Sequence, residues 1–209
     1  MAASKNDLTA DVAAYYTRTL EEYGATPRGV DWFGEEGQRN RFVQLARLLP
    51  VSNFSVNDLG CGYGAFYNFL SENHTDFQYI GYDVSSAMVE AARDVLPKAG
   101  VSILQAAKPT QVADFTVASG IFNVRMQRNP QEWQDYIFAT LDTIDAASTK
   151  GFAFNCLTTY SDVERMRPDL HYTDPLAMFD RCKRLYARNV ALLHDYDLWE
   201  FTILVRKSA

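Results

Sequence analysis

An acid, a glycine-rich turn and a second acid are the residues of this sequence whose types and spacing most directly suggest chemistry. Asp58 closes a short apolar run and is followed by Gly60, Gly62 and Gly64. Glycine lets the backbone lie against a ligand because no Cβ blocks the approach, and the free N–H groups of the following helix then face that ligand. Asp83 closes the next apolar run, where an acid can bind ribose hydroxyls. This is the layout of a nucleotide site.

Two classes of cofactor fit that layout. Gly60, Gly62 and Ala65 match the dinucleotide pattern G-x-G-x-x-A, in which a pyrophosphate lies on the helix N-terminus. Asp58 works against that ligand, because its carboxylate would face the phosphates. A cofactor with a sulfonium and an α-ammonium is favoured by the same carboxylate. A nicotinamide-dependent oxidoreductase remains the alternative, although the chain lacks the Tyr-x-x-x-Lys of short-chain dehydrogenases.

The Asp-x-Gly-x-Gly-x-Gly run resembles motif I of class I S-adenosylmethionine-dependent methyltransferases. The similarity covers about residues 53–118, and a C-terminal hairpin extends it to the end of the chain. It implies S-adenosyl-L-methionine as the cofactor, with backbone contacts from Gly60, Cys61 and Gly62 to its methionine part. Asp58 would lie near the α-ammonium, directly or through water, and Asp83 would accept both ribose hydroxyls.

The resemblance also implies the contacts at the two ends of the cofactor. Val84 and Met88 would flank the adenine, and Ser119 and Gly120 would leave the fourth strand beside the methionine moiety and the methyl group. One position departs from the family. Many relatives carry an acid after the third strand, on the adenine amino group, and here residues 105–107 are Gln-Ala-Ala. Either the glutamine replaces the acid, or backbone or water holds that edge.

Two polar residues continue the apolar stripe of a helix expected over residues 35–49, which Pro50 stops. Gln38 and Arg41 lie on the same side as Phe42 and Leu45, so they need partners. One interpretation is a local hydrogen bond or salt bridge. The other follows the resemblance, since some small-molecule methyltransferases use an N-terminal arginine on the cofactor carboxylate. In that case Arg41 grips the carboxylate and Gln38 assists.

Candidates for the chemistry follow the strands, because ligands bind at the carboxyl ends of strands in open α/β sheets. They are Asn123 after the fourth strand, Tyr160 after the fifth and His194 at the tip of the hairpin. Methyl transfer needs a base only if the acceptor carries a proton at neutral pH. His194 is the best-placed base, and a hairpin-tip histidine bonded to backbone is the equal alternative.

The elements that must position these residues alternate along the chain. Strands are expected over residues 54–58, 77–83, 101–105, 114–119 and 151–157, with helices starting near Gly64, Ser85 and Asn129. Residues 190–193 and 199–205 are too close for a parallel crossover, so they must form an antiparallel hairpin. The expected fold is α/β: a doubly wound, Rossmann-like, seven-stranded, mostly parallel sheet. Residues 1–50 form a helical N-terminal lid over the core of 51–209.

The composition limits the number of domains, the kinds of partner and the compartment that we expect. The 209 residues are 47% hydrophobic, which suits one globular domain. A net charge of −6 argues against nucleic acid as the main partner. Three cysteines without metal-ligand spacing, and no membrane-length apolar run, indicate a cytoplasmic protein without a metal site or membrane contact. We expect a monomer or homodimer that methylates O, N or S of a small molecule. A non-catalytic cofactor-binding module and a protein methyltransferase are the further alternatives.

Overall fold

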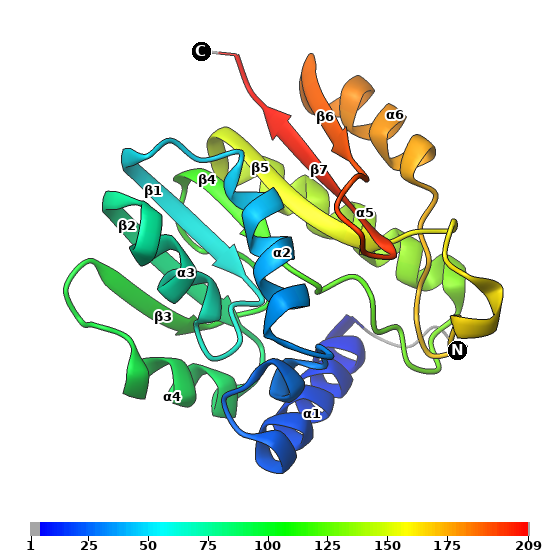
Figure 1. Ribbon diagram of the computed structural model, residues 1–209, viewed down its shortest axis with the longest axis horizontal. Coiled ribbons are helices and arrows are strands. Elements are labelled where there is room, and N and C mark those ends of the chain that lie inside the picture. Colours follow the sequence, from blue (N-terminus) through cyan, green and yellow to red (C-terminus); the bar gives the residue numbers. More distant parts are fainter. Residues whose placement is uncertain (1–4, 209) are drawn as a thin grey trace.

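The computed structural model describes residues 5–208, in which one seven-stranded sheet has the order β3-β2-β1-β4-β5-β7-β6 (Figure 1). The strands are β1 (Ser52–Leu59), β2 (Thr75–Asp83), β3 (Val101–Gln105), β4 (Ala113–Ala118), β5 (Ser148–Leu157), β6 (Asn189–Leu193) and β7 (Glu200–Arg206). The α-helices are α1 (Lys5–Tyr23), α2 (Glu35–Ala46), α3 (Ala65–Asn73), α4 (Ser86–Val95), α5 (Pro130–Ala146) and α6 (Pro175–Leu185). Two 3₁₀ turns are η1 (Pro27–Val30) and η2 (Val163–Arg165).

The strand directions confirm the expected architecture. The first five strands pair in parallel, and β7 enters antiparallel between β5 and β6. The β5–β7 register runs from Gly151 opposite Arg206 to Leu157 opposite Glu200. The hairpin therefore carries Glu200, the first residue of β7, to the carboxyl end of β5, where ligands bind in this fold.

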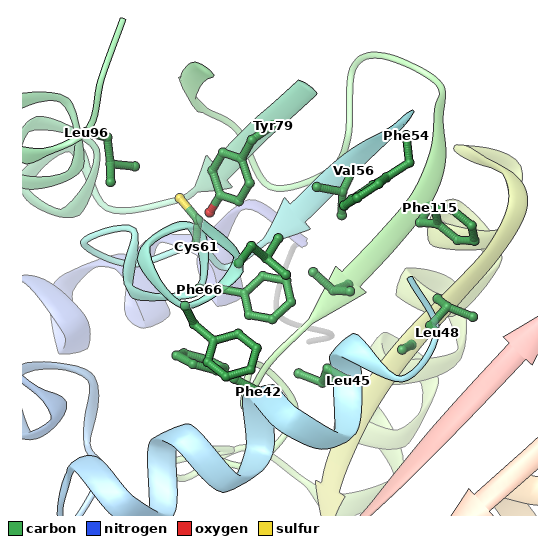
Figure 2. Close-up of a cluster of buried hydrophobic side chains, with 14 of the residues drawn as sticks. Phe42, Leu45, Leu48, Phe54, Val56, Cys61, Phe66, Tyr79, Leu96 and Phe115 are labelled. Atoms are coloured by element: carbon green, nitrogen blue, oxygen red, sulfur yellow. The ribbon is translucent and has the colours of Figure 1, made fainter. Parts of the chain in front are cut away.

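Each face of the sheet carries its own hydrophobic core, because successive strand residues point to opposite faces. Helices α2, α3 and α4 contribute to one core, and α5 and α6 contribute to the other. In β5 the alternation is direct: Ala153 belongs to the first core, whereas Phe152 and Phe154 belong to the second. Figure 2 shows Phe42 and Leu45 of α2 pointing into the first core, toward Phe66 of α3.

The N-terminal segment expected to act as a lid has two different environments. Helix α2 packs as a layer of the core, and Leu45 is fully buried there. Helix α1 and η1 lie beyond the end of the sheet toward which the parallel strands point (Figure 1). Val12 and Tyr16 of α1 and Val30 of η1 line a cavity at that end of the sheet, and Gln38 and Phe42 of α2 line it as well. Helix α2 ends at Ala46, three residues before the expected end, and η1 was not expected from the sequence.

Truncation of Leu45 tests whether α2 belongs to the core. Leu45→Ala leaves a cavity at a fully buried position, so we expect the free energy of unfolding to fall by about 2–5 kcal/mol in urea titrations. Val43→Ala is the matched control, because Val43 lies on the same helix and is 43% exposed. That control should change stability by no more than about 0.5 kcal/mol. Equal effects of the two substitutions would show that α2 does not pack on the sheet.

Candidate functional site

The glycine turn after β1 is tied to the end of β2 through its own amides. Gly60 N and Cys61 N donate to the Tyr82 carbonyl oxygen at 2.7 and 3.0 Å, and Gly62 N donates to the Asp83 carboxylate at 2.9 Å. A pyrophosphate at this turn would need N–H groups aimed at it, and these three are used within the protein. Any backbone contact from these residues to a ligand must therefore come from their carbonyl oxygens.

Asp58 is the buried acid behind this turn. It is 2% exposed, and the Tyr79 hydroxyl donates to its Oδ2 at 2.5 Å. Burial raises the pKa of Asp58 to about 7, against the hydrogen bond from Tyr79, which lowers it, and with a smaller contribution from the charge of Asp83. Burial thus favours the uncharged carboxyl more than water does, and a nearby cation would favour the carboxylate again.

Asp83 holds two backbone groups. Its carboxylate accepts the N–H of Gly62 and the N–H of Ser85, each at 2.9 Å, and the residue is 8% exposed. Burial raises the pKa of Asp83, although these backbone hydrogen bonds lower it. Asp83 therefore fixes the distance between the glycine turn and the start of α4, while its side chain also lines a cavity.

A first cavity of about 100 Å³ lies at the carboxyl ends of β1, β2 and β4. It brings together most of the cofactor residues expected from the sequence, namely Gln38, Asp58, Gly60, Cys61, Gly62, Asp83, Val84, Met88, Ser119 and Gly120. The Ser119 hydroxyl is buried and has no partner among the described residues. The volume of this cavity is below the range of about 300–1,000 Å³ that is usual for ligand pockets.

Helix α1 is held over the cavity by polar contacts with three other parts of the chain. Thr17 Oγ1 and Ser85 Oγ are 2.8 Å apart, and the Tyr15 hydroxyl donates to Asp31 Oδ2 at 2.9 Å. Arg128 forms an ion pair with Asp11 of the same helix. Helix α1 also contributes apolar packing, because Leu8 is buried in the second core and Val12 packs against it.

A second cavity, of about 720 Å³, adjoins the first. Tyr16, Val30, Trp32 and Gly120 line both. Gly120 has a φ of +76°, and a Cβ there would lie 2.3 Å from Cζ2 of Trp32. The indole therefore packs directly on the backbone that follows β4, and these shared residues form the boundary between the two spaces.

Arg41 lies outside the cavity in which the resemblance implied that it would grip the cofactor carboxylate. It lines the second cavity and not the first, and its guanidinium donates to both oxygens of Glu200, at 2.9 and 2.7 Å. The same guanidinium lies 3.8 Å from the centroid of the Trp32 ring. The other interpretation, a salt bridge, is the one that the structure shows. Gln38 does reach the first cavity, and it accepts a hydrogen bond from the Tyr63 hydroxyl at 3.2 Å.

Glu200 and Asn155 are site residues that the sequence analysis missed. Glu200 is 1% exposed and accepts hydrogen bonds from Arg41 and from the amide of Asn155. The Asn155 Oδ1 in turn accepts the N–H of Gly120 at 2.8 Å. The contacts form a closed ring at the boundary of the two cavities. They run from Arg41 through Glu200, Asn155 and Gly120 to Trp32, which contacts Arg41 again. Their signal was present as single polar residues inside the apolar strands β5 and β7.

The three catalytic candidates lie in two different environments. Asn123 is buried and lines the second cavity. His194 and Tyr160 are exposed, their rings are 5.9 Å apart, and neither lines either cavity. Other residues of the same two loops, Ser161 and Leu198, do line the second cavity. Gln105 is also exposed and donates to the Val84 carbonyl, whereas Ala106 and Ala107 line the first cavity.

Within residues 5–208, no group of three or more His, Cys, Asp or Glu side chains could hold a metal ion. In the same range, no helix is both long enough and apolar enough to cross a membrane. Cys61, Cys156 and Cys182 are buried and unbonded, and burial raises the pKa of each thiol.

Comparison with known proteins identifies the family. A family model for a methyltransferase domain matches residues 56–140. Over 157 residues the chain is 54% identical to Rv1506c of Mycobacterium tuberculosis, a protein named as a methyltransferase, and the match covers 75% of this chain and 95% of that one. A shorter match, 36% identical over 104 residues, joins 47% of the chain to 44% of the carboxy-S-adenosyl-L-methionine synthase of Campylobacter jejuni.

Solved structures show the same fold at low sequence identity. Magnesium protoporphyrin IX methyltransferase (ChlM) from Synechocystis, solved with bound SAM, has a TM-score of 0.69 at 12% identity, with both chains fully covered. DhpI in its SAM–HEP complex has a TM-score of 0.68 at 16% identity, covering 98% of this chain and all of that one. Sequence and fold agree, and the chain belongs to the class I S-adenosylmethionine-dependent methyltransferases.

Proposed function

We propose that this methyltransferase methylates an oxygen, nitrogen or sulfur atom of a small molecule held in the second cavity. The observation that carries the proposal is the space itself: about 720 Å³, sharing four lining residues with the cofactor cavity. Pockets of about 300–1,000 Å³ are typical of sites for small ligands. A net charge of −6 disfavours a nucleic-acid acceptor.

The residues of the first cavity fit S-adenosylmethionine. Asp58 and Asp83 are two buried carboxyls that favour a cationic, ribose-bearing ligand, and the Ser119 hydroxyl is an unused polar group. In the proposed arrangement Asp83 accepts the ribose hydroxyls and Asp58 lies near the α-ammonium. Val84 and Met88 flank the adenine. When bound, this cofactor supplies a methyl group already activated on a sulfonium.

The boundary between the cavities is the place where transfer would occur. Trp32 and Tyr16 present aromatic rings there, which attract a cation such as a sulfonium. Burial, with a further contribution from Asp31, raises the pKa of Tyr16 far above its ordinary value, so its hydroxyl stays protonated and is not a base. The chain's main contribution is alignment in a closed site, which supplies up to about 7–11 kcal/mol of a barrier.

Blocking the second cavity separates acceptor binding from cofactor binding. Gly34 lines only the second of the two cavities. Its φ of 175° is extended backbone that any residue can adopt, and a Cβ there would meet nothing within 4 Å. Gly34→Trp should therefore fill this space without strain. We expect transfer from labelled cofactor to the small-molecule fraction of a cell extract to fall at least about tenfold, with S-adenosylhomocysteine affinity unchanged. Gly34→Ser is the matched control and should keep full transfer. Label only in the protein fraction would contradict the proposal.

Removing the 2′-hydroxyl from the ligand tests whether Asp83 binds the ribose. Charge-assisted hydrogen bonds contribute about 1.5–3 kcal/mol each, so the wild type should bind S-adenosylhomocysteine at least about tenfold more tightly than its 2′-deoxy analogue. Asp83→Asn should lose this preference, as measured by calorimetry. The exposed Asp94 offers the control Asp94→Asn. Because Asp83 also supports the turn, lower affinity alone would be ambiguous, and a preserved preference for the hydroxyl would refute the assignment.

The raised pKa of Asp58 predicts a proton released on binding. The folded-state pKa of about 7 exceeds the value of about 3.9 in an unfolded chain. Ionisation of Asp58 therefore lowers the free energy of unfolding progressively as the pH rises from about 4 to 7. Above pH 7 this destabilisation is complete and stays constant. A bound ammonium stabilises the carboxylate, so binding near pH 6 should release close to one proton, and affinity should fall as the pH drops below about 7.

Calorimetry of S-adenosylhomocysteine binding in two buffers with different heats of ionisation measures this release. Asp58→Asn should abolish it, and Asp94→Asn should leave it unchanged. Binding without proton release by the wild type at pH 6 would show that Asp58 does not meet the ammonium.

A further inference from the structure

The order of the strands gives the first cavity a direction. Residues that line it follow the ends of β3, β2, β1 and β4, which lie in that order across the sheet. At the β4 end, Gly120 borders the second cavity, so the proposed function places the methyl group there. Asp83, at the end of β2, is the proposed ribose acid. The ribose of S-adenosylmethionine joins the sulfonium to the base, so the base must lie beyond Asp83, at the end of β3.

The residues that follow β3 offer this cavity only methyl groups. Asp83 lies opposite Gln105 in the β2–β3 register, so Ala106 lies beside Val84. Ala106 and Ala107 line the cavity, whereas Gln105 does not. The Gln105 amide donates to the Val84 carbonyl oxygen at 3.2 Å, and the Ala106 N–H donates to the Asp83 carbonyl oxygen at 2.9 Å. No side chain of residues 105–107 therefore presents a hydrogen-bond acceptor to the base.

The polar side chains that line the cavity come from elements other than β3. Among them, Gln38 belongs to α2, Asp58 to β1 and Tyr136 to α5, and Ser119 follows β4. A few well-placed polar groups give a ligand pocket its specificity. The end of the cavity at β3 lacks such groups on its own strand, unlike the ends at β1 and β2.

The same wall opens to solvent. Ala106 is partly buried, and Ala107 is exposed although it lines the cavity. Lys108, the next residue, is exposed and does not line the cavity. A residue that both lines a cavity and is exposed lies at its opening, and here its side chain is a single methyl group. A substituent on the edge of the base that faces Ala107 would therefore pass into solvent.

We propose that the cofactor site does not recognise the amino group at position 6 of the base, and that it accepts cofactor analogues altered there. The site tolerates removal of the amino group because no acceptor after β3 pairs with it. It tolerates a large substituent on the amino nitrogen because Ala107 leaves the edge open. This inference rests on the proposed function, since it describes the base end of the same cofactor. Ala106 and Ala107 are then the residues that set the specificity for the base.

Calorimetry with three ligands tests the proposal on the wild type. They are S-adenosylhomocysteine, its 6-deamino analogue, in which hydrogen replaces the amino group, and its N6-benzyl analogue. An acceptor that paired with the amino group would give about a tenfold preference for the ligand that carries it. We expect the three affinities to agree within about threefold, which is less than the effect of such a hydrogen bond.

Two substitutions test the position of the base. Ala106→Asp adds an acceptor, so it should favour S-adenosylhomocysteine over the 6-deamino analogue by about tenfold. Ala107→Phe narrows the opening, so it should weaken the N6-benzyl analogue by about tenfold and leave S-adenosylhomocysteine unchanged. Lys108→Phe is the matched control, because it adds the same ring one residue further along and outside the cavity. It should discriminate against neither analogue.

Each part of the proposal has an outcome that overturns it. A tenfold loss with the 6-deamino analogue in the wild type would show that a group of the protein recognises the amino group. A comparable loss with the N6-benzyl analogue alone would show that the wall is closed. If Ala106→Asp bound S-adenosylhomocysteine without any preference for the amino group, the base would lie elsewhere. Failure of S-adenosylhomocysteine itself to bind the wild type would instead contradict the cofactor assignment, on which this inference rests.

Discussion

Two carboxyl groups buried at one end of a sheet are the constraint on which this site depends. Asp58 and Asp83 have raised pKa values because burial penalises their charges, and no cation of the described chain is paired with either. Each is supported in a different way, Asp58 by the Tyr79 hydroxyl and Asp83 by two backbone amides. A ligand that brings positive charge and hydroxyl groups satisfies both acids at once. A ligand that brings phosphates does not, and the amides of Gly60, Cys61 and Gly62 are already used within the protein.

The second cavity follows a different principle, in which the most buried acid, Glu200, is paired with an arginine. Arg41, Glu200 and Asn155 come from α2, β7 and β5, and their contacts continue to the Gly120 amide and the Trp32 ring. A buried ion pair contributes little net stability. We interpret this one as the element that holds the C-terminal hairpin, the core helix and the loop after β4 at one distance. The boundary between the two cavities thereby depends on residues that lie far apart in the sequence.

Periodicity and turn chemistry were sufficient to predict the sheet, since the strand runs, the glycine turn and the short gap before the final strand are local signals. Most of the residues predicted to bind the cofactor line one cavity, because the carboxyl ends of β1, β2 and β4 meet there. Arg41 shows the limit. Its position on an apolar stripe showed that it needed a partner, but the partner, Glu200, lies 159 residues away and is set by the β5–β7 register. His194 and Tyr160 are exposed and line neither cavity, because position after a strand does not reveal which way a side chain points. Asn123 occupies the same kind of position and does face a cavity.

Thermal unfolding with S-adenosylhomocysteine, beside NADH, tests the central claim most directly. A ligand present at a hundred times its dissociation constant stabilises a protein by about 2.7 kcal/mol. For a chain of this size, that corresponds to a rise of roughly 5–10 °C in melting temperature. The account predicts this rise with S-adenosylhomocysteine and none with NADH. A rise with NADH alone would contradict it, because the buried acids and the occupied turn amides would then have accommodated a pyrophosphate.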